Sequence, residues 1–157
     1  MKSTYFLHGL ESSGNGTKGQ FFRQNFPSIQ RPDFSGSLAE RLKQLKDLCE
    51  NDYNLRFIGS SFGGLMATCF AVQFPERVNK LILLAPALNY GDFSPPTMQL
   101  DIQTLLIIGK NDDVTPIEPV IPLAEKTFTN LTTIIKDDDH MLHRTFKALD
   151  WQKLLML

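Results

Sequence analysis

Short apolar runs alternate along the chain with longer segments whose apolar residues recur at helical spacing. The runs suited to strands are residues 3–7, 28–32 (the weakest), 55–59, 80–84, 104–108 and 131–135. The segments suited to helices lie between them, ending at residue 25 and then covering 37–50, 62–74, 116–128 and the residues from 141 onward. This alternation predicts an α/β fold, with a mostly parallel sheet of about six strands and helices on both faces.

Two of the predicted helices carry boundary signals. Ser37 and Glu40 form the S-x-x-E pattern of a capping box, and leucines then recur at helical spacing. Pro75 is expected to end the helix predicted at residues 62–74. Residues 86–100 show neither period and contain Gly91, Pro95 and Pro96, so we expect them to be irregular.

The composition is that of an ordinary globular domain, with 157 residues, 42% hydrophobic and 21% charged, and we expect a single domain over residues 1–157. The net charge is −1 and the basic residues are scattered, so no nucleic-acid partner is expected. No apolar stretch reaches the length of a membrane span and no signal peptide is evident, which predicts a cytoplasmic protein without a membrane partner. Cys49 and Cys69 lie in apolar stretches and are expected to be core residues rather than a disulfide.

The most informative motif follows the strand predicted at residues 55–59. The run from Gly59 to Gly63 matches G-x-S-x-G, with Ser61 at its centre, between an apolar strand and an apolar helix. Such a turn is sharp enough to strain the serine backbone and to leave no room for side chains two residues before and after it. Glycine and serine also favour ordinary turns. The flanking strand and helix favour an exposed nucleophile, with the helix N-terminus stabilising developing negative charge.

A serine hydroxyl needs a general base, and the base needs an acid to orient it. His140 follows the last predicted strand, in a loop from which its ring can reach Ser61, whereas His143 is expected one turn into the next helix. Two carboxylates, Asp112 and Asp113, follow the strand predicted at residues 104–108 and compete for the role of acid.

Along the chain, the serine motif comes first, the aspartate loop second and the late histidine third. This order resembles that of the α/β-hydrolase superfamily, in which the nucleophile is followed by the acid and then by the histidine. The resemblance implies that Ser61 is the nucleophile and His140 the base. The family often has G-x-x-D-x-x-V-P in the loop of the acid, and alignment on Gly109 makes Asp112 the triad acid. The chain departs from this pattern at Thr115, where the family often has valine.

Other ionisable groups near these motifs are expected to lie outside the triad. Asp113 is expected to face solvent or to cap the following helix. Residues 137–139 are expected to form a solvated acidic loop, too close in sequence to His140 to be its partner. His8 precedes Ser61, so the order of the family excludes it as the base.

The oxyanion hole is expected to use two backbone donors. The first is the N–H group of Phe62, the residue after the nucleophile. The second is implied by the resemblance of His8-Gly9-Leu10 to the family's H-G-x motif, which makes Leu10 the donor and gives His8 a structural role. The chain is also similar to small bacterial esterase-like members without a lid, because residues 86–100 are too few for a cap domain.

The resemblance implies a serine hydrolase that cleaves a carboxylic ester or thioester of a small molecule through an acyl-enzyme on Ser61, without a cofactor or a metal. The alternative is a non-catalytic binding or interaction protein on the same scaffold. The glycine-rich loop at residues 9–19 lacks the G-x-x-x-x-G-K-[ST] pattern of a phosphate site. A metal site is disfavoured because the spacing lacks the H-E-x-x-H form. Its ligands would be Asp137, Asp139, His140 and His143.

Overall fold

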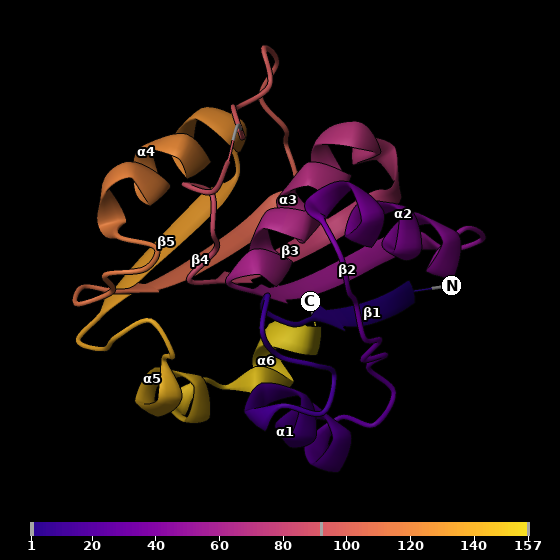
Figure 1. Cartoon of the computed structure of the whole chain (residues 1–157), viewed down its shortest axis with the longest axis horizontal. Helices are drawn as coiled ribbons and strands as arrows, with labels where there is room; N and C mark the ends of the chain where they lie inside the picture. The colour runs from indigo at the N-terminus through magenta and orange to yellow at the C-terminus, as the bar shows by residue number, and fades with distance from the viewer. Residues whose placement is uncertain (1, 92, 157) are drawn as a thin grey trace.

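The computed structural model describes residues 2–91 and 93–156, and one sheet of five parallel strands forms its centre. The strands are β1 (Lys2–Leu7), β2 (Tyr53–Ser60), β3 (Val78–Leu84), β4 (Gln103–Gly109) and β5 (Leu131–Lys136). They lie side by side in the order in which they occur along the chain, and every neighbouring pair is parallel. All five strands therefore end at the same edge of the sheet, and the loops that follow them meet there (Figure 1).

The segment predicted as a strand at residues 28–32 is not one. Gln30 forms a single parallel bridge with Tyr5 on the outer edge of β1, held by two backbone hydrogen bonds of 2.8 and 2.9 Å. Pro27 and Pro32 flank the bridge and have no N–H group to donate, so the ladder does not extend. The sheet has five strands rather than about six, and its parallel character is confirmed.

Helices cover both faces of the sheet, as predicted (Figure 1). On one face lie α2 (Leu38–Leu48), α3 (Phe62–Gln73) and α4 (Ile117–Thr127). On the other lie α1 (Thr17–Asn25), α5 (His143–Ala148) and α6 (Trp151–Met156). The last two replace the single helix expected from residue 141, because the extended backbone of Leu149 ends α5.

Each face of the sheet has its own hydrophobic cluster. Phe57 of β2 lies in the cluster around α3, and the next residue, Ile58, lies in the cluster of the opposite face. This is the alternation expected of a strand buried on both sides. The second cluster includes several aromatic side chains, and the rings of Phe22 and Trp151 meet there edge to face with their centroids 5.0 Å apart.

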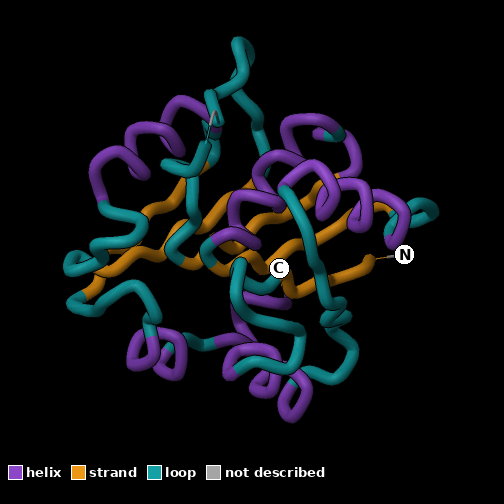
Figure 2. Tube along the Cα trace, in the orientation of Figure 1, coloured by secondary structure: helices purple, strands orange, loops and turns teal. Residues whose placement is uncertain are grey.

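Local signals in the sequence also have their expected structural effect. The Ser37 hydroxyl accepts a hydrogen bond from the Glu40 amide, and the Glu40 carboxylate accepts one from the Ser37 amide, which completes the capping box of α2. Residues 85–91 and 93–102, between β3 and β4, contain no helix and no separate cap domain (Figure 2). Within the described residues, no helix has the length and apolar character required to cross a membrane.

Candidate active site

Ser61 occupies a strained turn between β2 and α3. Its φ of 54° and ψ of −113° place it in a region that costs a non-glycine residue roughly 1–3 kcal/mol. The flanking glycines permit the turn, because a Cβ atom on Gly59 would lie 2.5 Å from the Gly63 carbonyl oxygen. A Cβ atom on Gly63 would lie only 1.9 Å from the carbonyl oxygen of Leu7 in β1. The turn presents the Ser61 hydroxyl at the carboxyl end of the sheet, beside the N-terminus of α3.

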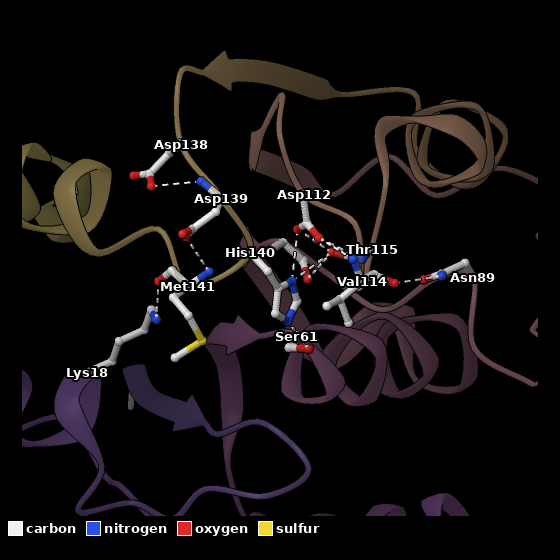
Figure 3. A network of polar contacts seen from close by, with 11 residues as sticks. Lys18, Ser61, Asn89, Asp112, Val114, Thr115, Asp138, Asp139, His140 and Met141 are labelled. Atoms are coloured by element: carbon white, nitrogen blue, oxygen red, sulfur yellow. Dashed lines mark hydrogen bonds and ion pairs between the residues drawn. The ribbon is translucent and has the colours of Figure 1, made fainter.

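The side chains of Ser61, His140 and Asp112 form one continuous hydrogen-bonded chain (Figure 3). Ser61 Oγ lies 3.1 Å from His140 Nε2, and His140 Nδ1 lies 2.8 Å from Asp112 Oδ2. The three residues come from loops that follow β2, β5 and β4. Their arrangement is the nucleophile–base–acid geometry that activates a serine hydroxyl.

Asp112 is buried and fully hydrogen-bonded. Its Oδ1 atom accepts from the amides of Val114 and Thr115 at 2.9 and 2.7 Å, and its Oδ2 atom accepts from the Thr115 hydroxyl at 2.7 Å. Burial acts to raise the pKa of Asp112, but the bonds from Thr115 and His140 outweigh it and hold the pKa below its ordinary value. Asp112 is therefore a carboxylate at neutral pH and accepts the Nδ1–H of His140.

Thr115 is a member of this network that sequence reasoning missed, since its difference from valine looked minor. Its Oγ1 atom also lies 3.2 Å from His140 Nδ1 and 3.3 Å from the carbonyl oxygen of Ala85 at the end of β3. A hydroxyl three residues after the acid was the available signal, because short polar side chains often bond to nearby groups in turns.

The loop that carries His140 is fixed on two sides. Lys18 Nζ of α1 donates to the carbonyl oxygen of Met141 at 2.8 Å (Figure 3). On the other side, the Asp138 carboxylate accepts from the amide and the hydroxyl of Thr145 at 2.9 and 2.8 Å, at the start of α5. These bonds hold the segment on either side of the imidazole ring.

Asp138 contradicts the prediction that residues 137–139 form a solvated acidic loop. Asp137 and Asp139 are exposed, but Asp138 is buried. Its burial acts to raise the pKa of Asp138, whereas the bonds from Thr145 outweigh this and lower it. Asp138 therefore anchors the loop as a buried carboxylate.

The two predicted oxyanion donors flank Ser61. Among the described residues, the backbone N–H groups of Leu10 and Phe62 form no hydrogen bond to another backbone group. His8 is buried, and burial lowers the pKa of its ring. Its Nδ1–H donates to the Gly9 carbonyl at 2.6 Å, and its Nε2 atom accepts from the Phe34 amide at 2.8 Å. His8 thus has the geometry of a neutral side chain that braces the loop.

Two cavities open beside Ser61. One of about 420 Å³ is also lined by Lys18, His140 and Met141. The other, of about 440 Å³, is lined mainly by apolar and aromatic side chains, which include both predicted oxyanion residues, and also by Glu11, Asn89 and Thr115. Its lining residues include Leu10, Phe62, Ala87, Tyr90 and Val114. The Ser61 side chain therefore borders two separate cavities.

Asp113 and His143, together with Phe93 and Met98 from the segment between β3 and β4, are not among the residues that line these two cavities. Asp113 is exposed, as expected, whereas His143 is exposed and is the first residue of α5 rather than one turn into the helix. Phe93 packs against the hydrophobic cluster around α3, and Met98 is 83% exposed. Within residues 2–91 and 93–156, no three His, Cys, Asp or Glu side chains are grouped so that they could hold a metal ion.

Comparison with known sequences supports the same fold. The family described as alpha/beta hydrolase fold matches residues 12–97, more than half of the chain. This match includes Ser61 but ends before Asp112 and His140. A homoserine O-acetyltransferase from Thermus thermophilus is 31% identical over 88 residues, or 56% of this chain, and the match spans 22% of that enzyme.

Solved structures match almost the whole chain. A protein from Xanthomonas campestris pv. campestris, assigned to the alpha/beta hydrolase superfamily, has 21% identity and a TM-score of 0.79, with 99% of each chain covered. Mouse alpha/beta hydrolase domain-containing protein 10 has 16% identity and a TM-score of 0.76, with 99% and 90% covered. An esterase from Exiguobacterium antarcticum has 15% identity and a TM-score of 0.76, with 99% and 91% covered. These structures share the fold of this chain.

Proposed function

Because the chain belongs to the alpha/beta hydrolase fold family, we propose that it is a serine hydrolase that cleaves a carboxylic ester or thioester of a small molecule. The hydrogen-bonded chain from Ser61 Oγ through His140 to the buried Asp112 carboxylate carries this proposal. A binding protein on the same scaffold would have no need for a serine, a histidine and a buried carboxylate hydrogen-bonded in series.

The proposed reaction has two halves. In the first, Ser61 Oγ bonds to the substrate carbonyl carbon as its proton passes to His140 Nε2, and Asp112 stabilises the imidazolium. The N–H groups of Leu10 and Phe62 bind the oxyanion. The bond to the leaving group then breaks, and the leaving oxygen or sulfur takes the proton from His140. In the second half, water attacks the acyl-enzyme with His140 as base, and the acid is released with Ser61 restored.

In the proposed complex, each cavity holds the part of the substrate on one side of the scissile bond. His140 must reach the leaving group to protonate it, so we assign the leaving group to the cavity that His140 and Met141 line. The acyl group then occupies the cavity lined by Leu10, Phe62 and Tyr90, whose mainly apolar walls suit a short hydrocarbon chain, with Glu11 and Asn89 as its polar members.

Acyl transfer to an alcohol is a second candidate, favoured by the similarity to homoserine O-acetyltransferase. The name of that enzyme describes the delivery of an acetyl group to an oxygen atom. The same acyl-enzyme would serve here, with the alcohol in place of water. Product analysis with and without added homoserine distinguishes the two, since a hydrolase releases free acid at an unchanged rate.

Labelling with a fluorophosphonate tests the proposal, because this reagent modifies activated serines. We expect labelling of the wild-type protein, none of Ser61→Ala, and much slower labelling of His140→Ala. Ser60→Ala is the matched control, since Ser60 precedes the nucleophile and lines the same cavity, and it should label normally. Absence of labelling in folded wild-type protein would overturn the proposal and favour a binding protein.

A further inference from the structure

Arg41, in the first turns of α2, is a buried cation without an anionic partner. It is only 5% exposed, and no carboxylate oxygen of the described residues lies within the 4.0 Å of an ion pair. Its Nη1 atom is buried and has no hydrogen-bond partner in the described part of the chain. A buried charge without a counter-ion is unfavourable for folding, so its presence calls for another explanation.

The contacts of Arg41 converge on the two residues of the proposed oxyanion hole. Its Nη2 atom donates to the carbonyl oxygen of Leu10 at 3.2 Å. Its guanidinium carbon lies 5.2 Å from the centroid of the Phe62 ring. Its Nε atom donates to the carbonyl oxygen of Gly36 at 2.9 Å, which fixes the guanidinium to the loop before α2. One rigid, planar group therefore joins the loop after β1 to the first residue of α3.

We propose that Arg41 is a positioning residue of the oxyanion hole, holding Leu10 and Phe62 at the separation that a tetrahedral oxyanion requires. The inference rests on the proposed hydrolase function. Leu10 belongs to a long loop, whereas Phe62 begins a buried helix, so the loop is the part that needs to be held.

A purely structural role makes a different prediction. If Arg41 served only to attach α2, its replacement would lower stability, and activity would fall only through the loss of folded protein. If Arg41 instead positions the hole, an apolar side chain of similar size removes an unfavourable buried charge and leaves stability unchanged or higher. The loss then appears in kcat, since the hole binds the transition state more strongly than the substrate.

The test compares Arg41→Met and Arg41→Gln with wild type, and Arg23→Met serves as the matched control because Arg23 is exposed on α1. Turnover of a short-chain p-nitrophenyl ester and the urea midpoint are measured for each protein. We expect kcat about tenfold lower in both neutral variants, somewhat less than the loss from removing a hole donor, with KM and the urea midpoint not impaired. Arg41→Lys should recover only part of kcat, because an ammonium lacks the planar fork of a guanidinium.

Each other outcome counts against the inference. Wild-type kcat in both neutral variants overturns it, as does full kcat in Arg41→Lys. Failure of both neutral variants to fold, or a fall in activity that only follows a fall in stability, assigns Arg41 a structural role instead. If the wild-type protein shows neither turnover nor fluorophosphonate labelling, the hydrolase proposal itself is refuted. The wild-type measurements therefore distinguish this failure from a failure of the inference about Arg41.

Discussion

Replacement of Thr115 by valine tests the network that holds the acid of the proposed triad. The change removes one hydroxyl and nearly preserves side-chain shape, so Asp112 Oδ2 loses its 2.7 Å bond while His140 and two backbone amides still bind the carboxylate. A hydrogen bond to a charged group contributes about 1.5–3 kcal/mol. We therefore expect the free energy of unfolding at pH 7 to fall by about 1.5–3 kcal/mol.

The sign of the pH dependence follows from the lowered pKa of Asp112 in the folded protein. Stability from such a group is fully present above its unfolded pKa of about 3.9, and it is lost as the pH falls through the folded pKa. We expect Thr115→Val to raise the pKa of Asp112 in the folded protein. The difference in free energy of unfolding between the variant and the wild type should therefore become smaller in acid. Urea unfolding at pH 7 and at a series of progressively lower pH values measures both effects, with Thr115→Ser as the control that keeps a hydroxyl. Equal stability at pH 7, or a difference that persists in acid, would refute the reasoning.

Three further changes have definite expected outcomes. Gly63→Ala should abolish folding, as measured by circular dichroism, because its Cβ atom would lie 1.9 Å from the carbonyl oxygen of Leu7; a native spectrum would contradict the proposed turn. Thr145→Val should lower the free energy of unfolding by about 1.5–3 kcal/mol at pH 7 and by less in acid, since it removes a hydroxyl bond to Asp138, whose folded pKa is lowered. Lys18→Met should lower kcat/KM for an ester by about tenfold with little loss of stability, because it frees the loop that carries the imidazole; unchanged kcat/KM would show that this contact is dispensable.

Features set by local pattern were predictable from the sequence. The apolar runs marked all five strands of the sheet, and the glycine spacing marked the turn at Ser61. The strand expected at residues 28–32 failed because its apolar content is weak and prolines limit its pairing to one bridge. The break between α5 and α6 was missed because the apolar periodicity continues through Leu149, and only the tertiary packing of Trp151 shows where the chain turns.

Features that depend on contacts distant in sequence were not predictable in this way. Arg41 lies 31 residues from Leu10, and the helical pattern gives its position on α2 but not its partners. Asp138 looked like part of a solvated acidic run, although its partner, Thr145, is seven residues away in α5. Thr115 differs, because its bond to Asp112 spans only three residues and had a local signal, whereas its contact with the imidazole ring of His140 depends on the fold.

Direct detection of the acyl-enzyme tests the central claim most sharply. Wild-type protein is mixed with excess p-nitrophenyl acetate, quenched in acid within the first turnovers, and mapped by peptide mass spectrometry. The proposed mechanism predicts a single acetyl group on Ser61, lost with time in the wild type and absent from Ser61→Ala. Ester turnover with no acetyl group on Ser61, or with the group on another residue, would contradict it.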